Sequence, residues 1–123
     1  MAQNSILIVD DNPVNLKLMR ILLAGAGHEV LTAADAEEAM QVIRESTPRL
    51  ILMDVQLPGI DGLELTRRLK ADPSTQNIKI LGLTAYAMKG DRERILAAGC
   101  DGYIPKPIDT RMLPGMIEEY LER

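Results

Sequence analysis

Five short, mostly apolar segments of strand-like composition alternate along the chain with five longer segments of helical character. The expected strands cover Ser5–Val9, Glu29–Ala33, Leu50–Asp54, 78–84 and 103–104. The run at Leu50–Asp54 is aliphatic without polar alternation, which is typical of a strand that helices cover on both faces. Parallel strands need long crossover connections, and these are right-handed. The alternation therefore predicts an α/β fold with one doubly wound, five-stranded parallel sheet and helices on both faces.

The first expected helix has clear boundary signals. Asn12 suits its N-cap, and Pro13 suits the first helical position, where a missing amide donor costs little. Gly25 and Gly27 are expected to end the helix. The apolar stripe that it should turn toward the core consists of Val14, Leu18, Ile21 and Leu22.

The other helices follow similar rules. Asp35, with Glu38 three residues later, forms a capping-box-like start for the second helix. Further helices are expected over 62–71, 88–98 and 109–121. Pro114 falls in the first third of the last helix, where it lacks an amide donor and disfavours helical geometry before it. Either this helix begins near Leu113, with Pro114 in its first turn, or it kinks there.

Composition limits the possible functions. With 123 residues, 46% of them hydrophobic, the chain can bury the core of one domain, which we expect over residues 1–123 without an output domain. The net charge of −4 argues against a nucleic-acid or anionic-membrane surface. One cysteine excludes an internal disulfide, no signal segment is evident, and no apolar run approaches the roughly 20 residues of a membrane span. These features predict a cytoplasmic protein, and the ends at Met1 and Arg123 favour a natural single-domain protein over a piece of a hybrid kinase.

Polar residues stand at the carboxyl ends of four expected strands. Asp10 and Asp11 follow the first strand, Asp54 ends the third, Thr84 ends the fourth and Lys106 follows the fifth. In doubly wound folds, ligands bind beyond these strand ends, where the strand order reverses. A single acid at a strand end is usually an exposed loop residue, but polar groups at four strand ends predict one shared site.

The charges of this site indicate its chemistry. Three carboxylates at one rim repel one another unless a cation lies between them. Mg²⁺ suits such a site because it binds hard oxygen ligands and leaves positions for phosphate oxygens. The Lys106 ammonium and the Thr84 hydroxyl would share the charge of a transferred phosphoryl group, and Asp54 would be the nucleophile that forms an acyl phosphate. Pro58 and Gly59 suit a type II turn that lines this rim with carbonyls.

Several motifs resemble those of a known family. They are Val9-Asp10-Asp11-Asn12, Leu52-Met53-Asp54-Val55-Gln56-Leu57-Pro58 with Asp61-Gly62, Leu83-Thr84-Ala85, and Tyr103-Ile104-Pro105-Lys106-Pro107. Over essentially its whole length the chain resembles the CheY-like receiver domains of two-component response regulators. The segments Asn15-Leu16-Lys17-Leu18-Met19 and Tyr86-Ala87-Met88-Lys89-Gly90-Asp91 are also similar to stand-alone, single-domain regulators of the DivK type. The resemblance implies the flavodoxin-like strand order 2-1-3-4-5.

The resemblance also implies how phosphate and metal would be bound. Asp54 would accept a phosphoryl group from the phosphohistidine of a histidine kinase or a histidine phosphotransfer protein. Asp11, Asp54 and the backbone carbonyl of Gln56 would bind Mg²⁺ directly, and Asp10 would act mainly through a coordinated water.

Phosphate oxygens would be held by the Thr84 hydroxyl, the Ala85 amide and Lys106, with a cis peptide bond between Lys106 and Pro107. Tyr103 would be a second switch residue, whose ring turns inward when the Thr84 hydroxyl moves to the phosphate; without the family it would be read as an ordinary half-buried strand residue. The switch would remodel the surface of the helices over 88–98 and 109–121 and the strand between them, to which a downstream protein would bind. The chain would be a monomer or a weak dimer.

Two residues are implied to flank the route of water to the phosphoryl group, Gln56 and Tyr86. Gln56 could orient a water molecule, whereas Tyr86 is large enough to cover the site. We expect shielding to dominate and autodephosphorylation to be slow, unless Tyr86 turns outward and serves as a partner contact. The chain would thus assist its own phosphorylation and dephosphorylation without being a conventional enzyme.

Two other functions fit the pattern less well. A phosphatase of the haloacid-dehalogenase type also uses an aspartyl phosphate, but it needs two acids spaced two residues apart after the first strand, whereas Asp10 and Asp11 are adjacent. A flavodoxin-like electron carrier would need a hydroxyl-rich phosphate loop and aromatic rings for the flavin. The chain has no Trp, no Phe and three Tyr, and its first strand ends in two acids.

Overall fold

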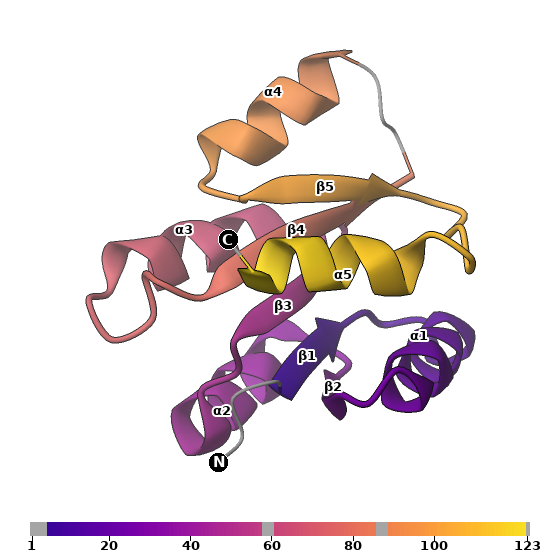
Figure 1. Cartoon of the computed structure of the whole chain (residues 1–123). Coiled ribbons are helices and arrows are strands. Elements are labelled where there is room, and N and C mark those ends of the chain that lie inside the picture. Colours follow the sequence, from indigo (N-terminus) through magenta and orange to yellow (C-terminus); the bar gives the residue numbers. More distant parts are fainter. Residues whose placement is uncertain (1–4, 58–60, 86–88, 123) are drawn as a thin grey trace.

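The computed structural model describes residues 5–57, 61–85 and 89–122, and Figure 1 shows the arrangement of its elements. These residues form a parallel sheet with the strand order β2-β1-β3-β4-β5. The strands are β1 (Ser5–Val9), β2 (Glu29–Ala33), β3 (Leu50–Asp54), β4 (Lys79–Thr84) and β5 (Gly102–Pro105). The helices are α1 (Pro13–Gly25), α2 (Ala36–Ser46), α3 (Gly62–Ala71), α4 (Lys89–Ala97) and α5 (Leu113–Glu122). The expected doubly wound fold and its strand order are confirmed.

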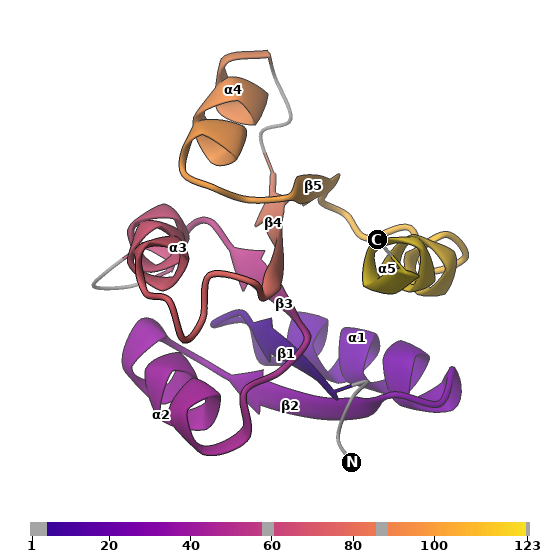
Figure 2. The same cartoon turned by 60° about the vertical axis from the view of Figure 1, so that its left-hand side comes forward.

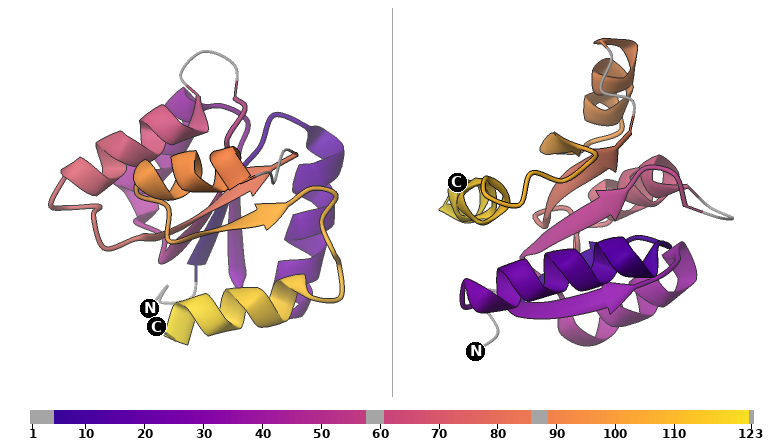
Figure 3. Two further views of the ribbon diagram at one scale, coloured as in Figure 1. Left: turned by 90° about the horizontal axis from the view of Figure 1, so that it is seen from above. Right: turned by 90° about the vertical axis from the view of Figure 1, so that its right-hand side faces the viewer.

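The sheet lies between two layers of helices, as Figures 2 and 3 show from three further directions. On one face, buried side chains of α2, α3 and α4 pack in one core with strand residues such as Leu7 and Ile51. On the other face, α1 and α5 pack in a second core with residues such as Ile6 and Leu52. Every residue of β1 and β3 is buried, because helices cover both sides of these central strands. This explains why their sequences lack polar alternation.

Capping side chains fix the points at which helices begin after the strands. Asn12 is the N-cap of α1, as predicted, and its Oδ1 accepts a hydrogen bond from Val14 N–H at 2.9 Å. The predicted start of α2 at Asp35 is also confirmed. A third cap was not predicted: Asp61 Oδ1 accepts from Glu64 N–H at 2.8 Å and begins α3. These caps satisfy amide donors that the first helical turn leaves unpaired, and they hold the helix starts that follow β1 and β3 in place.

The predicted core-facing stripe of α1 is wrong for Val14, Leu18 and Ile21, and correct for Leu22, which packs against the core. Most of the stripe is exposed, Val14 by 72%, Leu18 by 37% and Ile21 by 56%, while Leu22 is partly buried. The helix instead buries Met19 and Leu23 completely. Because α1 has apolar residues around much of its circumference, its own periodicity does not decide which side packs inward. That choice is made by the sheet and by α5, which share one core with α1.

The last helix begins later than expected. The sequence predicts a helix over 109–121, but α5 starts at Leu113 and places Pro114 in its first turn, where the missing amide donor breaks no helical hydrogen bond. The residues before α5 form a turn in which Asp109 Oδ1 accepts from Arg111 N–H at 3.0 Å and Met112 N–H at 3.3 Å. Of the two predicted alternatives, a start near Leu113 is therefore correct. Within the described parts of the chain, no helix has both the length and the apolar character needed to cross a membrane.

Candidate functional site

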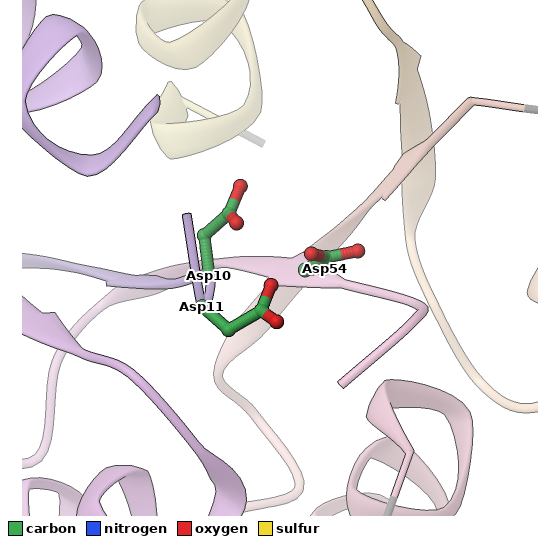
Figure 4. A group of neighbouring side chains, drawn as sticks. All are labelled: Asp10, Asp11 and Asp54. Carbon is green, nitrogen blue, oxygen red and sulfur yellow. The ribbon is translucent and has the colours of Figure 1, made fainter. Parts of the chain in front are cut away.

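Three acids from two adjacent strands meet at the carboxyl end of the sheet. The pairing of Val9 with Met53 places the ends of β1 and β3 side by side. As a result, Asp10, Asp11 and Asp54 each have a carboxylate oxygen within 4.8 Å of the others. Figure 4 shows the Asp11 carboxylate reaching from the end of β1 toward Asp54. Asp10 and Asp54 are buried, with 0% and 3% exposure, whereas Asp11 is exposed, so the cluster opens to solvent on one side.

Asp54 is held by one contact at each carboxylate oxygen. Its Oδ1 accepts a hydrogen bond from Gln56 N–H at 2.9 Å, and its Oδ2 lies 3.2 Å from the Lys106 ammonium. Burial raises the pKa of Asp54 above its ordinary value and outweighs the opposing effects of the Gln56 amide and Lys106, while nearby Asp10 raises the pKa further. Because burial disfavours the charged form of Asp54, a cation beside it would stabilise that form more than it would stabilise an exposed carboxylate.

Asp10 is held in a similar way from the start of α1. Its Oδ1 accepts from Asn12 N–H at 2.9 Å, and its Oδ2 accepts from the side-chain amide of Asn15 at 3.4 Å. The Lys106 ammonium lies 3.5 Å from the same Oδ2. The contact of Asn15 with Asp10 was not predicted from the sequence, where the only signal is an amide side chain one helical turn after the acids.

Lys106 joins the two buried acids. It follows β5, and its N–H donates to the carbonyl of Thr84 at 2.7 Å, which ties the loop to the end of β4. The peptide bond between Lys106 and Pro107 is cis, as the resemblance implied. The side chain is 22% exposed and is within ion-pair distance of both Asp10 and Asp54. One ammonium thus offsets the charge of two carboxylates that helices and strands bury.

The predicted phosphate-binding and switch residues lie on β4 and β5 or directly after them. Thr84 ends β4 with 2% exposure, and Ala85 follows it at the surface. Tyr103 is half-buried on β5 and packs against the core that α4 helps to form. The guanidinium carbon of Arg92 on α4 lies 5.9 Å from the centre of its ring, in the range of a cation–π contact. The side chain of Tyr103 is thus in contact with α4 as well as with the sheet.

Of the two residues expected to tune access to the site, Gln56 is exposed beside Asp54. Tyr86 lies outside the described residues, as do Pro58 and Gly59, for which a turn was predicted. A further residue at the site was not predicted: Gly62 begins α3 so close to the backbone carbonyl of Asp54 that a Cβ at this position would overlap it. Only glycine allows α3 to approach the end of β3 in this way.

The donor set fits a hard divalent cation. The three carboxylates lie close enough to share one ion, and the cluster has an exposed side through which water or a phosphate oxygen can reach it. Oxygen ligands with one or two carboxylates and open positions are typical of Mg²⁺ sites that also bind phosphate. The described cluster offers carboxylates only, without His or Cys, and this argues against the softer transition metals.

Comparison with known proteins agrees with this geometry. The family model of the response regulator receiver domain matches residues 6–118. The polar-differentiation response regulators DivK of Brucella anthropi and Brucella ovis are each 45% identical to the chain over 117 residues, which cover 95% of this chain and 95% of each relative.

Solved structures give the same result. A proposed response regulator from Chloroflexus aurantiacus is 37% identical, with a TM-score of 0.92 and 98% of each chain covered. The receiver domain of a sensor histidine kinase from Pseudomonas aeruginosa is 34% identical, with a TM-score of 0.88 and 98% of each chain covered. That structure has a magnesium ion coordinated in its active-site cleft. The CheY-like receiver domain protein from Methanospirillum hungatei is also 34% identical, with a TM-score of 0.88, 97% of this chain and 94% of that one covered.

Proposed function

The chain belongs to the family of response regulator receiver domains, and on that premise we propose that it is a single-domain response regulator of a two-component system or phosphorelay, phosphorylated at Asp54. The observation that carries the proposal is the ammonium of Lys106, which lies 3.2 Å from a buried Asp54 that also neighbours Asp10 and Asp11. A purely structural role for Asp54 would not explain why two further acids and a lysine from separate strands lie beside it.

The reaction is a phosphoryl transfer. An oxygen of the Asp54 carboxylate attacks the phosphorus of a phosphohistidine, and the bond between phosphorus and the imidazole nitrogen breaks. The imidazole leaves with the electron pair of that bond, and Asp54 becomes an acyl phosphate. Lys106, the Thr84 hydroxyl and the Ala85 amide hold the phosphoryl oxygens. The donor is a histidine kinase or a histidine phosphotransfer protein.

Mg²⁺ would be held directly by Asp11, Asp54 and the carbonyl of Gln56, with Asp10 acting through a coordinated water. When bound, the ion neutralises negative charge on the phosphoryl oxygens. Two groups of the chain orient the Asp54 carboxylate: the Gln56 N–H at Oδ1 and the Lys106 ammonium at Oδ2, which also places a positive charge beside the nucleophile. Burial of Asp54 limits the contact of the nucleophile with competing water.

The phosphodonor docks on the exposed face of α1, the apolar side that the core does not use. Val14, Leu18 and Ile21, with Pro13 and Lys17, line a shallow hollow of about 440 Å³ on this helix. The helix begins directly after the acids at the end of β1, so a helix of the donor lying in this hollow reaches the rim of the sheet. The sequence of α1 contains Lys17 and Arg20 and no acidic residue, which suits a donor surface with acids beside its apolar contacts.

Phosphorylation is read on another surface, formed by α4, β5 and α5, which binds a downstream protein. Tyr103 lies on this surface in contact with Arg92 of α4, and its movement together with Thr84 changes the surface. The phosphorylated form decays slowly, which makes the chain a switch with slow autodephosphorylation rather than a conventional enzyme. It acts in the cytoplasm as a monomer or weak dimer, without contact to nucleic acid or membrane.

Labelling with acetyl phosphate tests the proposal without a cognate donor. Wild-type protein should incorporate a phosphoryl group in millimolar Mg²⁺ and should not do so in EDTA. Asp54→Asn should abolish the labelling, whereas the matched control Asp72→Asn, which removes an exposed acid from the loop after α3, should retain it. Equal labelling of Asp54→Asn and wild type would refute the proposal.

A further inference from the structure

Asp10 is a fully buried acid whose two oxygens are held by different kinds of donor. Its exposure is 0%, so water contributes little to its stabilisation and the charge depends on neighbouring groups. Oδ1 accepts from the backbone N–H of Asn12 at 2.9 Å, a contact that the fold itself provides. Within the described part of the chain, Oδ2 lies 3.4 Å from the Asn15 side-chain amide and 3.5 Å from the Lys106 ammonium. The orientation of the second oxygen therefore depends on two side chains.

Lys106 is a shared partner. Its ammonium lies closer to Oδ2 of Asp54, at 3.2 Å, than to Oδ2 of Asp10, at 3.5 Å. Under the proposed function, on which this inference rests, the same ammonium binds a phosphoryl oxygen once Asp54 is phosphorylated. Its hydrogen bonds are then directed to the phosphoryl group, whose charge is greater than that of a single carboxylate. Asn15 is left as the side-chain donor to Asp10.

Asn15 is well placed for this task. It lies in the first turn of α1, where its own N–H donates to Asn12 Oδ1 at 3.3 Å, and its side chain is half-buried. Pro13 and the Asn12 cap fix the backbone of this turn. The side-chain amide is also uncharged. A lysine at this position would donate equally well but would repel a divalent cation bound by the neighbouring acids, whereas an amide donates without adding charge.

We propose that Asn15 is a positioning residue for the cation site: its amide fixes the rotation of the Asp10 carboxylate so that this acid faces the ion, without Asn15 being a ligand itself. Groups that orient metal-binding carboxylates by hydrogen bonds affect affinity because, without them, the carboxylate loses the orientation that the ion requires. Since Asn12 N–H and Lys106 also hold Asp10 before phosphorylation, we expect the contribution of Asn15 to be smaller than that of a sole partner.

The test is a titration of the whole chain with Mg²⁺, followed by amide chemical shifts in nitrogen-15 NMR spectra, for wild type and three variants. Asn15→Leu keeps the size and removes the donor, Asn15→Gln keeps an amide on a longer side chain, and Asn77→Leu makes the same change at an exposed asparagine before β4. Asn15→Leu should weaken Mg²⁺ binding by about three- to tenfold, which is less than the roughly 10- to 100-fold effect typical of groups that orient metal ligands. Asn15→Gln should recover part of this loss, and Asn77→Leu should bind like wild type.

A second measurement separates positioning from a general structural effect. The initial rate of labelling by acetyl phosphate should require about three- to tenfold more Mg²⁺ for half-saturation in Asn15→Leu, while the rate at saturating Mg²⁺ stays within about twofold of wild type. Unchanged Mg²⁺ affinity in the folded Asn15→Leu variant would overturn the inference, as would a lower saturating rate at unchanged affinity. If wild-type protein bound no Mg²⁺, the proposed function would fail and the inference with it; if wild type and Asn15→Leu bound it equally, only the inference would fail.

Discussion

Lys106 Nζ lies 3.2 Å from Asp54 Oδ2, although β4 separates the strand that ends in Asp54 from the strand that precedes Lys106. The contact is possible because Lys106 N–H donates to the carbonyl of Thr84 and so returns the loop after β5 across the end of β4. Since Asp10 and Asp54 are both buried, the same ammonium stabilises two charges that have little contact with water. The ammonium of Lys106 therefore links the ends of β1, β3 and β5, which are distant in the sequence.

Replacement of Lys106 by methionine tests this shared role. The variant Lys106→Met leaves two buried acids without their cation, so in EDTA at pH 7 we expect the free energy of unfolding to fall by about 1–3 kcal/mol. Urea denaturation measures this change. Lys79→Met, which removes a half-buried lysine at the opposite end of the sheet, should have a smaller effect. If both variants were equally stable, Lys106 would not stabilise the acids.

The pH dependence of stability follows from the direction of the pKa shift at Asp54. Burial raises the pKa of Asp54 in the folded protein, so the protonated form is the one that folding favours. Its contribution to stability is complete below the ordinary pKa of an aspartate and is lost as the pH rises through the raised pKa. At neutral pH in EDTA, Asp54→Asn should therefore melt at a higher temperature than wild type. This difference in melting temperature should shrink as the pH falls below the ordinary pKa of an aspartate, because Asp54 is then protonated in both the folded and the unfolded protein.

Asp72 provides a control of opposite sign for this experiment. Hydrogen bonds from the backbone and side chain of Ser74 lower the pKa of Asp72, so its contribution to stability is present above the ordinary pKa and is lost as the pH falls. Asp72→Asn should not stabilise the protein at neutral pH. An Asp54→Asn variant that was less stable than wild type at pH 7 in EDTA would contradict the account of a charge disfavoured by burial.

Gly62 should tolerate no larger side chain. Gly62→Ala adds a Cβ that overlaps the carbonyl of Asp54, so α3 must move away from the end of β3, and we expect a loss of about 1–3 kcal/mol in the free energy of unfolding. Gly115→Ala is the matched control in α5, where a Cβ meets nothing within 4 Å. It should stabilise the protein by about 0.5–1 kcal/mol, because alanine has the better helix propensity. Equal effects of the two substitutions would show that α3 does not press on Asp54.

Docking of the phosphodonor on α1 can be separated from the chemistry at Asp54. Leu18→Glu places a charge on the exposed apolar face of α1 and should change stability by no more than about 0.5 kcal/mol. Phosphotransfer from a histidine phosphotransfer protein should slow by about tenfold or more, because the charge would be buried in the interface. Labelling by acetyl phosphate, which needs no docking, should remain at the wild-type rate. Leu96→Glu, at an exposed leucine of α4, controls for the added charge. Equal phosphotransfer rates in wild type, Leu18→Glu and Leu96→Glu would exclude α1 as the docking site.

Much of the fold can be predicted from the sequence because its signals are local. Buried central strands need unbroken apolar runs, and helix starts need caps such as Asn12 and Asp35. The position of the acids also follows from local signals, since the carboxyl ends of adjacent parallel strands must share one edge of the sheet. What these signals do not contain is the packing between elements. The exposed Val14 and the buried Met19 of α1 are both apolar, and only the contact with the sheet and α5 distinguishes them.

The same reasoning explains what was missed at the site. The need for glycine at position 62 arises from the distance between α3 and β3, which a sequence does not show. The contact of Asn15 with Asp10 depends on the direction of a side chain in the first turn of α1. The start of α5 at Leu113 was one of two alternatives that the sequence left open, and Asp109 resolves it by closing the preceding turn.

The most direct test of the proposed function identifies the phosphorylated residue chemically. Borohydride reduces an acyl phosphate of aspartate to homoserine, which mass spectrometry locates in a peptide. After incubation with acetyl phosphate and Mg²⁺ and then reduction with borohydride, the protein should carry homoserine at position 54, and samples incubated in EDTA before the same reduction should carry none. Homoserine at a different acid, or a phosphoryl group on the protein without homoserine at position 54, would contradict the assignment of Asp54 as the phosphoacceptor.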